Sequence, residues 1–198
     1  MVILKNTGYT TSNKNSREIA FQTTLTILLV IKMQFSYRGI ARITLPDDWQ
    51  QLDPSMENAV RFRCPVKSDD SAVVGMTFYY REESISNGSF QKFKELLQRP
   101  VHSLSPAEFI ETAEIIRDAS DNNYFEMTQA YTKMLKGRMI YVVQGHWTVA
   151  DTNSLAFFVP EDGEATRRLL ELYFIAPPDL FEVHLANATE IFSTIEWA

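Results

Sequence analysis

The chain has 198 residues, enough for one ordinary domain with a substantial core. Hydrophobic residues make up 45% and charged residues 22%, a balance that is typical of globular chains and excludes a wholly disordered one. The net charge of −6 at pH 7 disfavours general nucleic-acid binding, because a phosphate backbone requires a basic surface. The single cysteine, Cys64, excludes an intrachain disulfide, a thiolate zinc site and an iron–sulfur cluster.

The N-terminal region differs from the rest of the chain. Residues 1–19 are polar, and the longest apolar run, Ala20–Ile31, follows them. This run is shorter than the roughly 20 apolar residues of a membrane-spanning helix, and neither a small-residue cleavage site nor a lipid-accepting cysteine accompanies it. We therefore expect residues 1–32 to be an extension outside the fold, with an uncleaved anchor or an extra strand as alternatives. We expect a cytoplasmic rather than a periplasmic or membrane-anchored protein, and the sequence leaves open whether translation starts at Met1 or Met33.

Three segments with alternating polarity come next. Apolar side chains occupy every second position of Phe35–Leu45, Asn58–Lys67 and Ala72–Glu82, as expected for half-buried strands. Pro46–Trp49 and Lys67–Ser71 have the composition of turns. The pattern predicts a first antiparallel meander in which these strands pair in chain order.

The middle of the chain changes to a helical period. Ser89 is a candidate N-cap for a short helix that carries Phe90, Phe93 and Leu97. Ser105–Glu108 is a stronger signal, because it combines an N-cap serine, a proline at the first helical position and a glutamate three residues after the cap. The helix that follows is expected to bury a stripe made of Phe109, Ile110, Ala113 and Ile116.

A second meander is predicted in the C-terminal third. Its four strands are expected at Tyr124–Leu135, Arg138–Val149, Ser154–Pro160 and Arg168–Ala176. The links between them are short, which favours antiparallel neighbours, and Lys136-Gly137 supplies a glycine for a hairpin turn. Pro177-Pro178 ends the last long strand, and Asp179 is expected to cap a final helix with Glu182 at the reciprocal position.

These elements predict one α+β domain over residues 33–198. An antiparallel sheet of about six or seven strands packs against helices in a two- or three-layer sandwich. The chain also resembles the PsbP/Mog-like α/β sandwiches, and most closely the bacterial DcrB-like branch. The resemblance is carried by Leu45–Trp49, by Gly145–Trp147, and by the proline pair that precedes a helix ending in Ile191–Trp197. It implies a binding protein, since that group includes adaptors and chaperones for secreted effectors.

The sequence contains no recognisable catalytic motif. GxSxG, HExxH, P-loop and GxGxxG patterns are absent. His102, His146 and His184 lack a second ligand at a helical or hairpin spacing, so we expect no metal, no cofactor and no catalytic residues. The enzymatic alternative is a site assembled from distant residues such as His146, Glu171 and Tyr173.

Two sets of side chains are candidates for binding a partner. If the first two strands pair with their apolar faces on the core, four arginines share the outer face: Arg38, Arg42, Arg61 and Arg63. They could bind a carboxylate-rich or phosphorylated partner, or simply form a solvated face. Adjacent aromatics such as Tyr79-Tyr80 and Phe157-Phe158 must point to opposite faces of a sheet. Coverage of the second face by helices is favoured; the alternative is an apolar groove that involves Tyr79, Tyr141, Trp147 and Phe158.

The sequence therefore predicts a non-enzymatic protein-binding module. Its expected role is that of an adaptor, chaperone or immunity-type partner for a bacterial secreted effector or toxin. A homodimer is a further candidate assembly, and nucleic acid is not expected as a partner. The alternative is an envelope-associated scaffold or lipoprotein-like protein that is anchored or exported through residues 20–31.

Overall fold

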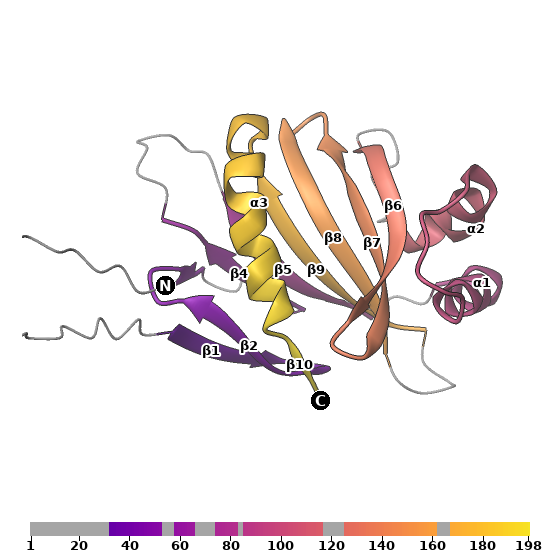
Figure 1. The fold of residues 1–198 in the computed structure, drawn as a ribbon, viewed down its shortest axis with the longest axis horizontal. Coiled ribbons are helices and arrows are strands. Elements are labelled where there is room, and N and C mark those ends of the chain that lie inside the picture. The colour runs from indigo at the N-terminus through magenta and orange to yellow at the C-terminus, as the bar shows by residue number, and fades with distance from the viewer. Residues whose placement is uncertain (1–31, 53–57, 66–73, 83–84, 117–124, 162–166) are drawn as a thin grey trace, which may run out of the picture.

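A computed structural model describes residues 32–52, 58–65, 74–82, 85–116, 125–161 and 167–198. Within these ranges the chain forms two antiparallel sheets and three helices (Figure 1). The larger sheet has seven strands in the order β3 (Gln50–Gln51), β4 (Ala59–Arg63), β5 (Gly75–Arg81), β9 (Leu169–Ala176), β8 (Thr152–Pro160), β7 (Arg138–Trp147) and β6 (Phe125–Leu135). The smaller sheet has the order β1 (Lys32–Tyr37), β2 (Ile40–Pro46) and β10 (Glu196–Trp197). The helices are α1 (Asn87–Leu97), α2 (Pro106–Ile116) and α3 (Pro178–Ser193).

Helices cover both faces of the seven-stranded sheet. Figure 1 shows α3 lying across one face beside the smaller sheet, and α1 and α2 at the end of the sheet where β6 and β7 lie. On the α3 face, the rings of Phe157 and Phe192 are 4.5 Å apart. On the α1/α2 face, the rings of Tyr141 and Phe93 are 6.0 Å apart. The predicted α+β sandwich is confirmed, and so is the division of Phe157 and Phe158 between two covered faces.

The second meander forms as the sequence predicts, with β6, β7, β8 and β9 all antiparallel neighbours. Lys136 and Gly137 have φ values of 49° and 82°, the positive values that a tight hairpin of this kind requires at both central residues. The capping box of α2 also forms. Ser105 N–H donates to Glu108 at 2.8 Å, and Glu108 N–H donates to the Ser105 hydroxyl at 3.4 Å.

The first meander differs from the prediction. Phe35–Leu45 is not one strand, because the chain reverses at Arg38-Gly39 and forms the β1–β2 hairpin. Phe35 lies opposite Ile43, so both strands of the hairpin direct alternate apolar residues to the same core, and the sequence pattern continues across the turn. β2 pairs with β1 and β10 rather than with β4, so the expected meander is divided between two sheets.

Two predicted helix caps are also wrong. The N-cap of α1 is Ser86, whose hydroxyl accepts from Ser89 N–H at 3.3 Å, so Ser89 lies inside the helix. The N-cap of α3 is Pro177, whose side chain cannot form a capping hydrogen bond. Asp179 lies in the first turn of the helix. Local sequence identifies residues that can cap a helix, but the entry path of the chain decides which one does.

The buried stripe of α2 is rotated from the predicted one. Thr112 and Ile115 are buried, whereas Ile110 is 73% exposed. The predicted polar connections at Lys67–Ser71 and Asp118–Asn123, and residues 1–31 of the extension, lie outside the described residues. Among the described helices, none combines the length and the apolar character that a membrane crossing requires.

Candidate functional site

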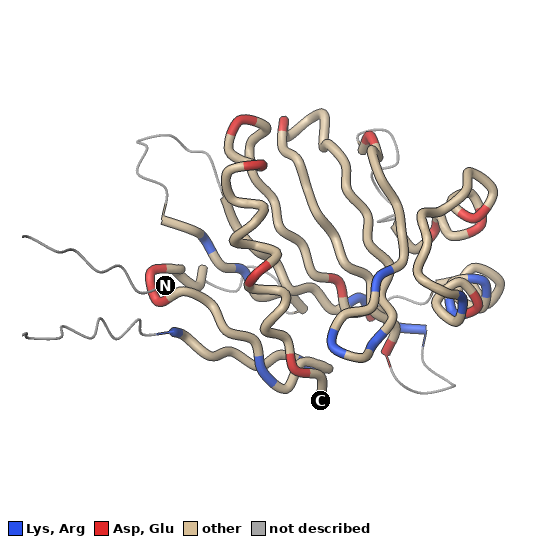
Figure 2. Tube along the Cα trace, in the orientation of Figure 1, with Lys and Arg blue, Asp and Glu red and all other residues tan. Residues whose placement is uncertain are grey.

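The four arginines of the predicted basic face are not brought together. Arg38 lies in the β1–β2 turn with a φ of 47°, and Arg42 on β2 forms an ion pair with Glu196. Arg61 and Arg63 belong to β4 in the other sheet. Figure 2 shows basic residues spread over both sheets and α1. The expected common face fails because it required β2 and β4 to be neighbours.

The predicted aromatic contacts lie mostly in the core. Tyr141 and Phe158 are fully buried on the α1/α2 face, with ring centroids 5.9 Å apart, and burial raises the pKa of Tyr141 to about 12. This burial argues against a contact with a partner. Trp147 packs on Phe125 at 4.7 Å at the end of β7, and Tyr79 is half-buried on β5.

The residues of the enzymatic alternative lie on opposite faces of the large sheet. His146 is on the α3 face, where its Nδ1 is 2.9 Å from Asn153 Oδ1. Glu171 and Tyr173 are hydrogen-bonded to each other on the α1/α2 face, next to Arg81. In the part of the chain that the structure describes, no group of three or more His, Cys, Asp or Glu side chains is arranged to hold a metal ion.

A different feature stands out at β6, which lies at one edge of the large sheet, with β3 at the other. Only part of its outer side is paired, by the short segment 102–104 that precedes α2. Leu104 N–H donates to Ala130 C=O, and Thr132 N–H donates to His102 C=O, both at 2.9 Å. On its outer side, away from β7, the stretch of β6 before Ala130 has no strand beside it among the described residues. An open strand edge of this kind can pair with another chain.

An apolar groove of about 570 Å³ runs along this open stretch, between β6 and the start of α2. Its lining residues are Ser103, Leu104, Ser105, Pro106, Phe109, Met127, Thr128, Gln129, Ala130 and Tyr131. A volume in this range is typical of small-molecule pockets. The lining contains no charged side chain, so the groove offers apolar contacts together with neutral hydrogen-bonding groups of the backbone and of side chains such as Thr128 and Gln129.

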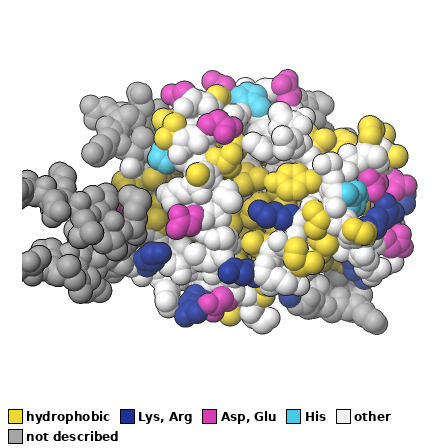
Figure 3. All heavy atoms as spheres, in the orientation of Figure 1, with side chains coloured by type: hydrophobic (Ala, Val, Ile, Leu, Met, Phe, Trp, Pro, Cys, Tyr) yellow, Lys and Arg dark blue, Asp and Glu magenta, His cyan; other side chains and the backbone are white. Residues whose placement is uncertain are grey.

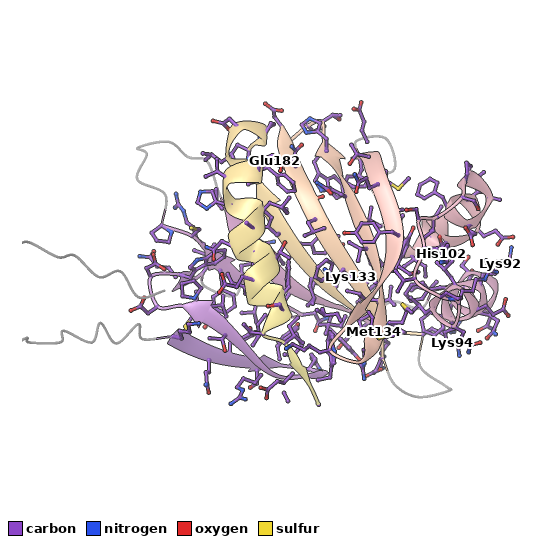
Figure 4. All side chains as sticks on the ribbon, in the orientation of Figure 1. Lys92, Lys94, His102, Lys133, Met134 and Glu182 are labelled. Atoms are coloured by element: carbon purple, nitrogen blue, oxygen red, sulfur yellow. The ribbon has the colours of Figure 1, made fainter. Side chains whose placement is uncertain are left out.

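Exposed apolar side chains also occur on the elements that form the groove and just before them. Val101, Ile110 and Met134 are 57%, 73% and 50% exposed, and they account for three of the five large hydrophobic side chains exposed in the described residues. Figure 4 shows Met134 and His102 on the same side of the molecule, near α1. Figure 3 shows further apolar side chains on the part of the α3 face that the helix leaves uncovered. The groove residues together with Val101, Ile110 and Met134 are called the β6-edge surface below.

The wall of the groove is held by a hydrogen-bonded cluster around Glu108. Its carboxylate accepts from Ser105 N–H and the Ser105 hydroxyl, each at 2.8 Å, and lies 3.1 Å from His102 Nε2 and 2.5 Å from Arg99. The Ser105 hydrogen bonds, followed by the nearby His102, lower the pKa of Glu108 to about 2. The cluster therefore joins segment 102–104 to α2 and keeps this wall in place at neutral pH.

Gly145 on β7 permits the close approach of the start of β6. It lies opposite Met127, and a Cβ at this position would be 2.6 Å from Glu126 C=O and 2.8 Å from Cε2 of Phe125. Only a glycine lets the start of β6 lie this close to β7. The sequence pattern identified β6 as a strand but gave no signal that it lies at an edge, so the site was missed.

Comparison with known proteins gives a similarity of fold. No protein-family model matches the chain, and no curated protein matches it. Among solved structures, the chain is similar to the solution structure of cyanobacterial PsbP (CyanoP) from Synechocystis sp. PCC 6803, with a TM-score of 0.52 and 11% identity. The match covers 90% of this chain and 99% of that chain. The predicted resemblance is confirmed at the level of a PsbP-like α+β fold; the DcrB-like branch is not shown.

Proposed function

We propose that the protein is a non-enzymatic protein-binding module whose partner contacts the β6-edge surface. The observation that supports this most directly is the apolar groove beside an open strand edge. Contiguous apolar surface is rarely exposed on soluble proteins unless it contacts a partner. Val101 precedes segment 102–104, Ile110 follows the groove residue Phe109 on α2, and both side chains are more than half exposed.

We include in this proposal the specific role that the sequence predicts. An adaptor, chaperone or immunity-type partner of a bacterial secreted effector needs a surface that recognises one protein, and the β6-edge surface meets that need. The PsbP-like fold is compatible with this role but does not imply it, because one fold hosts many functions. The envelope-associated alternative depends on residues 20–31, which lie outside the described residues.

A photo-crosslinking experiment tests the proposal. A photoreactive phenylalanine analogue replaces Ile110 in the full chain, which is expressed in its native organism, and crosslinked proteins are identified by mass spectrometry. Val183 on α3 is the matched control, because its exposure of 70% is close to that of Ile110 but it lies outside the β6-edge surface. We expect one defined protein to crosslink from position 110 and not from position 183.

The purified partner then allows a quantitative test. Ile110→Asp is expected to weaken binding by about tenfold or more, because it places a charge in an apolar contact, whereas Val183→Asp leaves binding unchanged. Equal crosslinking from both positions, or the absence of any crosslinked protein, would contradict the proposed function.

A further inference from the structure

We propose that protonation of His102 controls how firmly segment 102–104 is held against α2 and β6. The protonated ring holds the segment in place, and loss of the proton loosens it. Because the segment pairs with the outer side of β6 at residues 130–132, its release uncovers the backbone of the edge strand there. This inference goes beyond the proposed function and does not depend on which partner binds.

The ring of His102 lies between two hydrogen-bond acceptors. Its Nδ1 is 2.7 Å from Pro100 C=O, and its Nε2 is 3.1 Å from Glu108 Oε1. A carbonyl oxygen can only accept, and so can the oxygens of Glu108, which is ionised at neutral pH because its pKa is about 2. A neutral imidazole carries one N–H group, whereas the protonated ring carries two. Only the protonated ring therefore makes both hydrogen bonds.

The neutral ring turns a lone pair toward one of the two acceptors, whichever nitrogen carries the hydrogen. The Thr132 hydroxyl is 3.4 Å from Nδ1, too far to replace the 2.7 Å contact with Pro100. The backbone of His102 pairs with β6: its N–H donates to the Thr132 hydroxyl at 3.1 Å, and its C=O accepts from Thr132 N–H at 2.9 Å. Loss of a ring hydrogen bond therefore acts directly on the residue that joins the segment to β6.

Among the described residues, two charged side chains contact the ring or the carboxylate that it binds. Glu108 on α2 favours the protonated ring, and His102 in turn helps to lower the pKa of Glu108. Arg99, which follows α1, lies 2.5 Å from the same Oε1 and opposes a second positive charge. Arg99 is 50% exposed and the ring only 28%, so solvent screens this repulsion more than the attraction to Glu108. The β6 side chains on this face are uncharged: Ala130, Thr132 and Met134.

The direction of the pH effect follows from these contacts. The segment in place supplies acceptors for both ring hydrogens, so it binds the proton more tightly than the released segment does. The segment is therefore held best at low pH, and it loosens as the pH rises through the range of about 6 to 7 in which histidine side chains ordinarily lose their proton. The hydrogen bonds from Ser105 to Glu108 involve no titration in this range and keep the start of α2 in place.

Hydrogen exchange of backbone amides, measured by NMR on the full chain at about pH 5.5 and about pH 7.5, tests this inference. Protection factors, which correct for the intrinsic effect of pH on exchange, are compared at Leu104 and Thr132, whose N–H groups join the segment to β6. We expect both protection factors to fall by about tenfold at the higher pH, because a hydrogen bond to a charged group is lost. Val142, which is buried on β7 between β6 and β8, is the reference and should keep its protection.

Two variants assign the effect to the ring. His102→Gln removes the titrating group but keeps an amide that can donate to Glu108, so the protection of Leu104 should no longer depend on pH. Arg99 also binds Glu108 but stays charged at both pH values. Arg99→Gln is therefore the matched control and should retain the pH dependence.

Equal protection of Leu104 and Thr132 at both pH values would overturn the inference, as would a pH dependence that persists in His102→Gln. A parallel loss of protection at Val142 would also overturn it, because the whole domain rather than the segment would then respond to pH. The first comparison uses the unmodified chain, so it decides the question even if His102→Gln fails to fold. These results do not bear on crosslinking from position 110, which tests the proposed function separately.

Discussion

Loss of the buried ion pair between β5 and β9 is expected to destabilise the whole domain. Arg81 Nε lies 2.5 Å from Glu171 Oε1, and the two side chains are only 7% and 2% exposed. Arg81 also donates to Ile115 C=O at 2.9 Å, so its guanidinium joins the end of α2 to the sheet. Arg81→Met removes the cation and leaves a carboxylate in the core, a change that typically costs about 3–5 kcal/mol.

Urea unfolding followed by tryptophan fluorescence measures this cost. The matched control is Arg99→Met, because Arg99 is half-exposed in its pair with Glu108 and its loss should cost about 1 kcal/mol or less. A double variant, Arg81→Met with Glu171→Leu, should recover much of the lost stability, since no charge stays buried. A cost below about 1 kcal/mol for Arg81→Met, or no recovery in the double variant, would refute the reasoning.

Three further outcomes are expected. Ser105→Ala should cost about 1 kcal/mol and raise the pKa of Glu108 from about 2 toward 4.5. Because the fold lowers the pKa of Glu108, its ionised carboxylate stabilises the native protein above pH 4.5, and this stabilisation is lost as the pH falls toward 2. The Ser105→Ala variant should therefore lose less stability than the unmodified protein over this interval. An unchanged pKa of Glu108 in an NMR titration of the variant would contradict this. Gly145→Ala should cost about 1–3 kcal/mol and speed hydrogen exchange at Met127, whereas unaltered exchange would argue against the close packing of β6 and β7. Cys64 is buried, and burial raises the pKa of its thiol, so a thiol reagent should label it only at the rate of unfolding; rapid labelling of the native protein would contradict this.

Most of the individual elements could be predicted because their signals are local. The four strands of the second meander follow from alternation, and the Lys136-Gly137 hairpin follows from the backbone freedom of glycine. The capping box at Ser105 and Glu108 was predicted from four consecutive residues and forms as expected. Each of these signals acts within a few residues, so no knowledge of the tertiary structure was needed.

The predictions that were wrong depended on contacts between distant segments. Alternation could not reveal the reversal at Arg38-Gly39, because β1 and β2 face the same core. The predicted stripe of α2 included Ile110, which is exposed, since the surface against which α2 packs determines which residues are buried. The predicted basic face was wrong for the same reason, because it required β2 and β4 to be neighbours in one sheet.

The sequence by itself determined most of the elements, the α+β class and the PsbP-like resemblance, because hydrogen bonding, backbone preference and alternation act along the chain. Only the tertiary structure decided that β6 lies at an edge of the larger sheet, that Tyr141 and Phe158 are buried, and that a groove lies beside Ala130. The order of strands in a sheet depends on contacts among residues far apart in sequence, and these contacts set which backbone groups remain open to a partner.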